Sequence, residues 1–375
     1  MTIAIDGRSL QGAYGGIDVY THQLLLHLLK SDTTHRYIIF FNARKTVEHR
    51  FECDLTRVRV IQTHIPSRIF NAMLFLFHLP KLDLFLERIA GEKIDLFFMP
   101  NLNFAAFSPA ARLMITLHDL SFLYYSQQLS WKSRLWHLTI RPHHLIERAQ
   151  VLLAVSDSCK RDVQREYTIS SDVIHVVPLG IEKSFFQTEA SEEESLPLIL
   201  AFCPQEGRKN CETLLEAFAL ARMKDIRFRE MVLVLGGVRK IPHRIQRRIH
   251  SLGVSDAVKI IPYVPIERRY RLLQSARVCV YPSLYEGFGM PPLESFAARV
   301  PVIAGAHSSI PSVSGDGVWY CDVYDVHALA ESLLLLTFNT EIRQRAIRQG
   351  AKIATQYEWS QTARETLSKA ISVCV

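Results

Sequence analysis

The 375-residue sequence is poor in cysteine: it has seven, an odd number, and no two of them form a C-x-x-C pair. This absence argues against a disulfide framework or a zinc site, and we expect a reducing cytoplasm as the protein's environment. Long hydrophobic runs are also missing, since no apolar stretch reaches the roughly 18 residues that cross a bilayer. The longest, Ile69–Leu79, includes Asn71 and His78 and stops before Pro80. It predicts a buried helix rather than a surface that contacts lipid.

A strong charge of either sign is absent as well, because 44 Lys and Arg face 37 Asp and Glu, giving a net charge of +7. This modest excess favours anionic partners such as phosphates or acidic lipids. We predict no nucleic-acid partner, since no nucleic-acid-binding module is recognisable. The 48% hydrophobic composition excludes collagen and wholesale disorder, and the length predicts two domains. The first residues, which include Asp6 and Arg8, do not have the pattern of a signal peptide.

Short β-branched runs alternate with longer amphipathic segments, which is the pattern of βαβ units and parallel sheets. The acidic, aperiodic stretch 188–195 predicts a boundary between two such α/β sets, with a ligand cleft between them at the carboxyl ends of the strands. The predicted strands are Thr2–Ile5, Tyr37–Phe41, Val58–Gln62, Leu96–Met99, Leu113–Leu117, Val151–Val155, Ile174–Val177, Leu198–Phe202, Met231–Leu235, Val258–Ile261, Val278–Tyr281, Val302–Ala304 and Trp319–Cys321. The predicted helices are Val19–Lys30, Leu82–Gly91, Trp131–Ala149, Cys159–Tyr167, Cys211–Ala221, Pro242–Leu252, Arg268–Ser275, Pro292–Ala298 and Val326–Thr337.

The densest group of residues that could support chemistry is 281–294, between a predicted strand and a predicted helix. Gly287 and Gly289 permit close approach of a ligand to the backbone, and Pro292 suits the first position of the following helix. Free N–H groups at a helix start form a site for phosphate. Taken singly, the two acids of this stretch would be a solvated loop residue and a complement to the helix dipole. Together with two glycines and two prolines at one sheet edge, they indicate a binding site.

The stretch EGFGMPPLESFAARVPVIA, residues 286–304, resembles the signature EGFGLPxLEAMACGxPVIA of the retaining, nucleotide-sugar-dependent glycosyltransferases of family four, also called group 1. The resemblance implies a GT-B fold, in which two Rossmann-like α/β domains face a central cleft. It places Glu286 beside the donor hexose and assigns Glu294 to the ribose hydroxyls of the nucleotide, which suits a carboxylate that accepts hydrogen bonds. It also assigns donor binding to the intervening loop residues Gly287, Phe288, Gly289 and Met290.

Two cations follow the first strand of the second set. The run CPQEGRKN, residues 203–210, resembles the family's GTLEPRKN loop, which implies that Arg208 and Lys209 neutralise the donor diphosphate. Cys203 stands where the family has glycine, and Ala298–Val300 replaces its A-C-G turn. Ser312 stands where the family usually has glutamate, a change that we expect to bear on sugar specificity.

The first half of the chain also resembles the family. Gly15 and Gly16 open the first long helix as in the family's G-G-I-G-R-Y-T loop, which implies donor binding. His118 lies in a segment similar to T-x-H-D-L, and the resemblance places it near the reacting centre. Ser156 is predicted to cap the next helix. The chain end from Tyr357 is similar to the family's F-S-W-E-x-x-A helix, which crosses back to the first domain.

The resemblance covers nearly the full length and implies three parts. These are an acceptor-side domain at 1–182, a donor-side domain at 183–356 and a returning C-terminal helix at 357–375. The predicted activity is retaining hexosyl transfer without a metal or other cofactor, because no Asp-x-Asp motif of the metal-dependent kind occurs. The implied catalytic residues are His118, Arg208, Lys209 and Glu286, and Glu286 is not expected to act as a nucleophile.

GDP-mannose is the first-choice donor, because the 203–210 loop most resembles that of bacterial mannosyltransferases, and UDP-glucose and UDP-GlcNAc are the alternatives. The expected acceptor is a bacterial surface polysaccharide, a lipopolysaccharide or a lipid-linked glycan, with peripheral contact at the inner face of the membrane. A catalytically silent sugar-binding protein of the same fold is a further alternative. A nicotinamide-dependent oxidoreductase is disfavoured, since no G-x-G-x-x-G follows an early strand.

Overall fold

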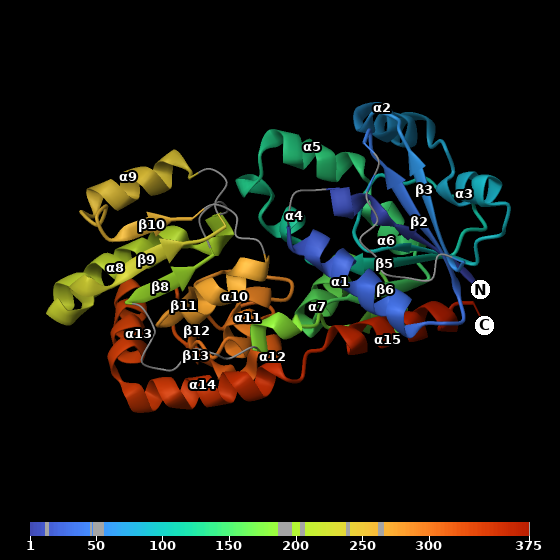
Figure 1. The fold of residues 1–375 in the computed structure, drawn as a ribbon. Helices are drawn as coiled ribbons and strands as arrows, with labels where there is room; N and C mark the ends of the chain where they lie inside the picture. Colours follow the sequence, from blue (N-terminus) through green and yellow to red (C-terminus); the bar gives the residue numbers. More distant parts are fainter. Residues whose placement is uncertain are drawn as a thin grey trace. The chain divides into compact units, whose positions relative to one another are not determined.

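The computed structural model describes residues 1–11, 15–45, 47, 56–186, 197–202, 207–237, 241–261 and 266–374. They form two compact α/β units, one of residues 1–180 with 359–375 and the other of residues 181–358 (Figure 1). The predicted boundary stretch 188–195 and Cys203 lie outside the described residues.

The first unit is built on a seven-stranded parallel sheet in the order β3-β2-β1-β4-β5-β6-β7. Its central strands are buried along their whole length, as parallel strands are when helices cover both faces of a sheet. Its strands are β1 (Thr2–Asp6), β2 (Arg36–Asn42), β3 (Val58–Thr63), β4 (Leu96–Met99), β5 (Leu113–Leu117), β6 (Val151–Ala154) and β7 (Ile174–Val176). Its helices are α1 (Gly16–Ser31), α2 (Ser67–Ala72), α3 (Leu82–Ala90), α4 (Ser121–Tyr124), α5 (Trp131–Thr139), α6 (Pro142–Arg148), α7 (Asp157–Glu166) and α15 (Trp359–Ser372).

The second unit is built on a six-stranded parallel sheet in the order β10-β9-β8-β11-β12-β13. Its core forms where α8 and α13 pack together over buried residues of β8, β9 and β11. Its strands are β8 (Leu198–Ala201), β9 (Val232–Leu235), β10 (Val258–Ile260), β11 (Val278–Tyr281), β12 (Val302–Ala304) and β13 (Val318–Tyr320). Its helices are α8 (Cys211–Lys224), α9 (His243–Ser251), α10 (Ile266–Gln274), α11 (Met290–Ala297), α12 (Ile310–Ser314), α13 (Val326–Phe338) and α14 (Thr340–Ala354).

The last helix, α15, belongs to the first unit although the second unit precedes it in the chain. It packs along α1 (Figure 1), and the rings of Trp359 and Tyr20 have centroids 6.0 Å apart. Thr362 donates its hydroxyl hydrogen to the Pro178 carbonyl at 2.8 Å, close to the point where the chain leaves this unit. These contacts join the two ends of the first unit.

The predicted strands are confirmed, with each end displaced by at most one residue. The capping prediction for Ser156 is also confirmed, since its Oγ accepts a hydrogen bond from the Cys159 amide at 3.1 Å at the start of α7. The prediction of one helix over Trp131–Ala149 is wrong. The structure has α5 and α6 there, separated at Arg141 and Pro142, because proline lacks the N–H that a continuous helix needs.

The helix predicted to begin at Pro292 begins two residues earlier, at Met290. Gly289, in the left-handed region at φ 97°, ends the preceding loop, so both prolines fall within the first turn, where a missing N–H costs nothing. Glu294 therefore lies in the second turn of α11, whereas the predicted helix from Pro292 would place it in the first. It is too far along the helix to act mainly as a complement to the dipole.

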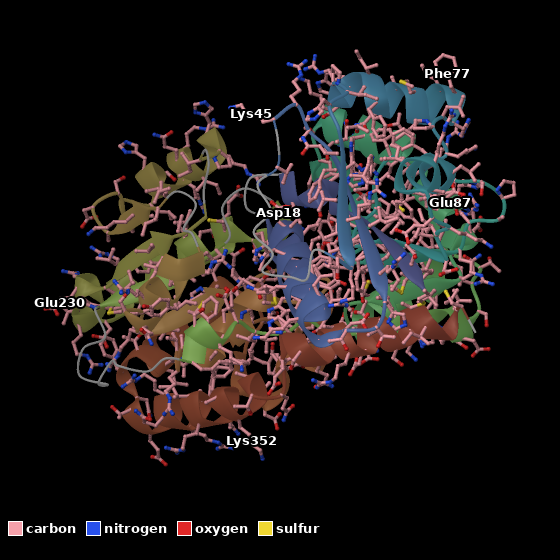
Figure 2. All side chains as sticks on the ribbon, turned by 45° about the vertical axis from the view of Figure 1, so that its right-hand side comes forward. Asp18, Lys45, Phe77, Glu87, Glu230 and Lys352 are labelled. Atoms are coloured by element: carbon pink, nitrogen blue, oxygen red, sulfur yellow. The ribbon has the colours of Figure 1, made fainter. Side chains whose placement is uncertain are left out.

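The prediction of a buried helix at Ile69–Leu79 is wrong as well. The segment forms α2 and the π-helical turn η2 (Met73–Phe77), and only one side, with Phe70 and Leu74, is buried. Leu76 and Phe77 are exposed, and Figure 2 shows Phe77 at the surface. The segment is apolar all round, so its pattern does not mark which side faces the sheet. Within the described residues, no helix has the length and apolar character needed to cross a bilayer.

Candidate functional site

The strand order of the second sheet reverses between β8 and β11. These two strands are neighbours in the sheet, although β9 and β10 separate them in the chain. In doubly wound sheets, the crevice at the carboxyl ends of two such strands is the usual ligand site. The short helix η7 (Gly207–Lys209) follows β8, and the loop 282–289 follows β11. The fold therefore brings the two motifs predicted from sequence to one edge of one sheet.

Glu286 is the centre of this arrangement. Its Oε1 lies 2.5 Å from Lys209 Nζ and its Oε2 lies 3.1 Å from Arg208 NH1, with 9% of the side chain exposed. Arg208 also donates to the Tyr285 carbonyl at 2.7 Å, and Lys209 donates to the Tyr281 hydroxyl at 3.1 Å. We call Arg208, Lys209 and Glu286 the switch-point cluster. Glu286 is therefore not the solvated loop acid that it would be if taken singly, because this carboxylate is buried and paired.

Electrostatics keep Glu286 ionised. Burial by itself raises the pKa of its carboxyl, but the charges of Lys209 and Arg208 outweigh burial and lower the pKa to about 2. At neutral pH the side chain is thus an acceptor of hydrogen bonds and has no proton to give. The cluster carries a formal charge of +1, because two cations face one carboxylate.

Glu294 is held by a different cation. Arg269 of α10 places one guanidinium nitrogen, NH1, 2.8 and 3.0 Å from the two carboxylate oxygens, and Glu294 is only 1% exposed. The Arg269 guanidinium also lies 5.8 Å from the centre of the Phe202 ring, which follows β8. Sequence reasoning missed Arg269, which belongs to no motif. A signal was available in physical terms, since a carboxylate inside a largely apolar helix requires a partner.

Serine hydroxyls fasten the loop before α11. Ser308 donates to the Glu286 carbonyl at 2.5 Å and accepts from the Glu286 amide at 3.2 Å. Ser309 donates to the Phe288 carbonyl at 2.9 Å, whereas Ser312, the predicted specificity position, donates to the Ser309 carbonyl at 3.0 Å, three residues earlier in the chain. These two loop-binding serines were not predicted.

The loop residues predicted to bind the donor differ in their burial and in the atoms that a ligand could reach. Phe288 is buried, with its ring edge-on to Tyr357 at 5.8 Å, so its side chain serves packing and only its backbone is left for a ligand. A Cβ on Gly289 would lie 2.7 Å from the Ile310 Cδ1 methyl group, so the Ile310 side chain would have to shift. Gly287 is buried and Met290 is partly exposed at the first position of α11.

In the first unit, His118 follows β5, as predicted. Its Nε2 lies 2.9 Å from the Pro100 carbonyl, which only accepts hydrogen bonds, so Nε2 carries a proton and Nδ1 of the neutral ring is the acceptor. Burial lowers the pKa of His118, which favours this neutral form. Its ring is edge-on to Tyr20 at 4.7 Å. Asp119 binds the start of α4 through the Ser121 amide at 2.8 Å, a structural role.

Gly15 and Gly16 lie at the start of α1, as predicted, and are exposed. Gly15 donates its amide to Asp18 Oδ2 at 3.0 Å. A Cβ on either glycine would meet no atom of the described residues within 4 Å, and Gly15 has an ordinary extended backbone. Packing within the described part of the chain therefore gives no reason for glycine at these positions.

The structure thus brings Arg208, Lys209 and Glu286 into direct contact and places Glu294 on the following helix. His118, Gly15 and Gly16 belong to the other unit. Among the described residues, no three His, Cys, Asp or Glu side chains are grouped as ligands for a metal ion.

Comparisons with known proteins show the family and the fold. The family model "Glycosyl transferases group 1" matches residues 182–353 and the model "Glycosyltransferase Family 4" matches residues 14–185. The solved structure of HepE from Anabaena in complex with UDP-glucose has a TM-score of 0.74, with 16% identity over 99% of this chain and 100% of that one. Fold and site define a glycosyltransferase with two parallel-sheet α/β domains, the GT-B fold. The chain belongs to the group 1 glycosyltransferases of family four.

Two curated relatives are similar over much of the chain. O-antigen chain mannosyltransferase B of Escherichia coli is 29% identical over 269 residues, which are 68% of this chain and 69% of that protein. MMP alpha-(1->4)-mannosyltransferase of Mycolicibacterium hassiacum is 29% identical over 223 residues, 58% of this chain. This second match spans about half of the relative, 53% of its length.

Proposed function

We propose that this protein transfers a hexose, with retention of configuration and without a metal, from a nucleoside diphosphate sugar to a glycan acceptor. The observation that supports the proposal most directly is the switch-point cluster. Two cations and a carboxylate meet at the sheet edge where doubly wound folds bind nucleotides, and the surrounding loop is matched by the group 1 family model.

In this proposal each charged group meets the donor group of complementary chemistry. Arg208 and Lys209 bind the diphosphate and stabilise the negative charge that grows on it as the sugar leaves. Glu286, ionised and restricted to accepting, binds hydroxyls of the hexose. Glu294 accepts hydrogen bonds from the ribose hydroxyls, with Arg269 holding its carboxylate in place.

The bond that breaks joins the anomeric carbon of the hexose to the phosphate oxygen, and the bond that forms joins the same carbon to the acceptor oxygen. The acceptor hydroxyl gives its proton to the departing phosphate on the same face of the sugar, so atoms and charges balance without a protein nucleophile. A carboxylate with a pKa of about 2, paired with two cations, is a weak nucleophile, which agrees with a binding role for Glu286.

First-unit residues take part in the same proposal. His118 offers Nδ1 as an acceptor for a sugar hydroxyl, because Nε2 is occupied by the Pro100 carbonyl. At Gly15 and Gly16, open space beside the backbone permits close approach of a phosphate or sugar, which a side chain would prevent.

Mannose from GDP-mannose is the donor we propose first, because the two curated relatives described above are named as mannosyltransferases. The name of the Escherichia coli relative also supports a polysaccharide or lipid-linked glycan as acceptor, and hence peripheral contact with the inner face of the cell membrane. UDP-glucose or UDP-GlcNAc is the second candidate, since the similar HepE structure contains UDP-glucose.

The test combines binding and turnover. Thermal unfolding of the purified protein is measured with GDP-mannose, UDP-glucose, UDP-GlcNAc and NADH, each with and without EDTA, and hydrolysis or transfer is followed with the same donors. We expect one nucleotide sugar to raise the unfolding temperature and to turn over, both insensitively to EDTA. A response to NADH alone, or to none of the four, would contradict the proposal.

Variants then connect the activity to the cluster. Lys209→Ala and Glu286→Gln should each lower turnover by roughly 100-fold or more, as loss of a preorganised charge does. Lys224→Ala and Glu331→Gln are matched controls, because this ion pair of 3.1 Å lies on the surface of the same unit. Full turnover in both cluster variants would remove the assigned roles. Donor binding without turnover in the wild-type protein would favour the silent sugar-binding alternative.

A further inference from the structure

Helix α5 presents its apolar stripe to solvent. Trp131, Leu135 and Leu138 recur at positions i, i+4 and i+7, which places them on one face of the helix. They are between 52% and 75% exposed, and no residue of α5 is fully buried. An amphipathic helix normally turns this face to the core, so an exposed stripe indicates a surface that another body covers.

A second apolar surface belongs to α2, η2 and the residues after them. Ile69, Leu76, Phe77 and Leu79 are between 53% and 68% exposed. Single exposed apolar side chains are common on soluble proteins, but these four lie within eleven consecutive residues. The segment is anchored from beneath by Phe70 and Leu74, so its exposed side is held in place.

Arg141 joins the two surfaces. Its guanidinium lies 5.3 Å from the centre of the Phe75 ring in η2, and its NH1 lies 2.5 Å from Nε2 of His78. A small groove is lined on one side by Leu74 and Phe75 and on the other by residues at the end of α5. Figure 1 shows α2 and α5 at the same end of the first unit. Arg141 and this groove therefore lie between the two apolar surfaces and join them.

The two segments that form this surface carry charges of one sign. Residues 56–82 and 120–146 contain no Asp or Glu at all. Arg68 precedes the first apolar group, and Lys132, Arg134 and Arg141 accompany the second. We call the following residues the docking patch: Arg68, Ile69, Leu76, Phe77, Leu79, Trp131, Lys132, Arg134, Leu135, Leu138 and Arg141. Apolar side chains surrounded by cations are the composition that favours the boundary of an anionic bilayer.

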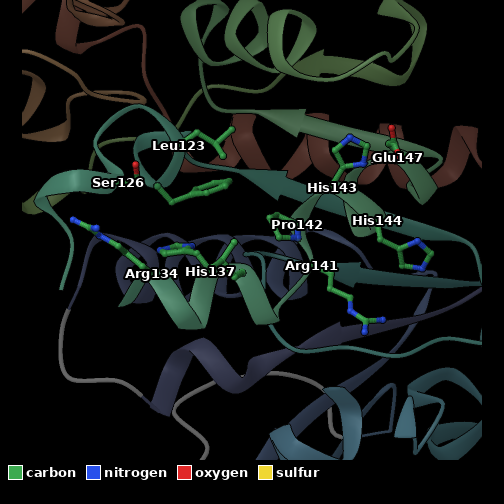
Figure 3. A pocket seen from close by; sticks show the side chains of 11 residues that line it. Leu123, Ser126, Arg134, His137, Arg141, Pro142, His143, His144 and Glu147 are labelled. Atoms are coloured by element: carbon green, nitrogen blue, oxygen red, sulfur yellow. Dashed lines mark ion pairs between the residues drawn. The ribbon is translucent and has the colours of Figure 1, made fainter. Parts of the chain in front are cut away.

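A cavity of about 720 Å³ opens beside the patch, between α4, α5 and α6 (Figure 3). Leu138, Arg134 and Arg141 line it and also belong to the docking patch, so the cavity is continuous with the surface. The one acid in its lining, Glu147, is paired with His143 at 2.8 Å. The cavity thus offers cations to an anionic group that enters from the patch side.

We propose that the docking patch binds an anionic phospholipid bilayer, with its apolar side chains among the acyl chains and a headgroup phosphate in the adjoining cavity. The inference rests on the membrane contact of the proposed function and adds the residues and the lipid class. A second copy of the chain is a poorer occupant, because two patches face to face would bring the same cations together. An anionic bilayer supplies both the missing negative charge and the apolar cover.

The experiment measures sedimentation of the full-length protein with vesicles, without any sugar nucleotide. One set of vesicles is phosphatidylcholine alone, and the other contains phosphatidylglycerol at one part in three. We expect binding to the anionic vesicles only, weakened at high salt, since attraction between cations and headgroups is screened. Equal binding to both vesicle types, or none to either, would overturn the proposal.

Four double variants, two in the docking patch and two controls outside it, test whether vesicle binding depends on the patch. Phe77→Ser with Leu138→Ser removes apolar contacts, and Arg68→Glu with Lys132→Glu reverses charge. Each should lower the vesicle partition coefficient at least tenfold, given about fivefold for each cation near an anionic surface. Met223→Ser with Ile226→Ser is the apolar control, since both side chains are more than 70% exposed in the other unit. Lys352→Glu with Lys369→Glu is the charge control.

The outcomes separate this inference from the proposed function. Patch variants should retain the wild-type circular dichroism spectrum and the wild-type hydrolysis of donor, because no patch residue is assigned to donor chemistry. Equal loss of binding in the patch and control variants would overturn the patch assignment. Concentration-dependent dimers that only the Phe77→Ser, Leu138→Ser variant abolishes would show a self-interface and would also overturn it. Vesicle binding by a protein without transferase activity would leave the patch intact and remove the function.

Discussion

Replacing Glu286 by glutamine tests the central electrostatic argument. The folded protein lowers the pKa of this carboxyl from 4.5 to about 2, a difference of roughly 2.5 units. At about 1.36 kcal/mol per unit, the ionised form is stabilised by about 3 kcal/mol in the folded state. Glu286→Gln removes this charge and leaves Arg208 and Lys209, which are only 12% and 17% exposed, without their counter-charge. We therefore expect the free energy of unfolding of the second unit to fall by about 3 kcal/mol at pH 7.

The pH dependence has a defined sign. Because the folded pKa of Glu286 lies below the unfolded one, its stabilisation is complete above about pH 4.5 and is lost as the pH falls towards 2. The variant has no carboxyl at this position and cannot lose that contribution. Urea unfolding followed by circular dichroism at several pH values should show the two proteins converging in stability across this window.

Binding of GDP tests the effect of Glu286→Gln in a second way. If the two cations bind a diphosphate, GDP can replace the missing carboxylate, and it should raise the unfolding temperature of the variant by more than that of the wild type. Glu331→Gln is the control, and its loss should stay within about 0.5 kcal/mol because its ion pair is exposed. A Glu286→Gln variant as stable as wild type at pH 7, or a difference independent of pH, would refute the reasoning.

Three further predictions follow from the local geometry. Gly289→Ala should cost about 2–4 kcal/mol in urea unfolding, whereas Gly253→Ala, also left-handed but with no atom within 4 Å of its Cβ, should cost only about 1–2. Arg269→Gln leaves Glu294 buried without a cation, so the free energy of unfolding should fall by about 3–5 kcal/mol. Calorimetry should also show weaker binding of GDP-mannose. Unchanged binding would exclude the role of Arg269 in positioning the Glu294 carboxylate. Ser156→Ala should lower stability by about 1 kcal/mol, and Ser156→Gly by only a few tenths, if capping is its role.

The strands were predictable from sequence because parallel strands are buried on both faces and appear as short, continuous apolar runs between turn residues. The helices were less predictable from sequence. Helix α14 was not predicted, because its buried face is made of Arg343, Gly350 and two alanines beside Ile347 and so gives only a weak apolar signal. The exposed side of Ile69–Leu79 was mispredicted for the opposite reason, because a segment that is apolar all round has no polar face to mark the solvent side.

The site residues were predicted from the resemblance to the family, which requires only the residue types and their order in the chain. The pairing of those residues was not predictable, because sequence does not state which cation each carboxylate will meet. Arg269 and Ser308 have no motif of their own and become visible only when α10 and the loop after β12 fold against Glu294 and Glu286. Such partners depend on tertiary contacts between residues 22 or 25 positions apart.

The pairing of Glu286 with Arg208 and Lys209 bears on how a donor would bind. Long cationic side chains lose about 2 kcal/mol of conformational entropy each when they are fixed, and here the carboxylate already fixes both of them. A diphosphate then meets ordered cations, and it shares them with Glu286 because the site keeps a formal charge of +1. The carboxylate therefore has two effects: it orders the site in advance, and it weakens the hold on diphosphate. The second effect favours release of the nucleoside diphosphate after transfer, so Glu286→Gln should bind GDP more tightly than wild type even where it transfers more slowly.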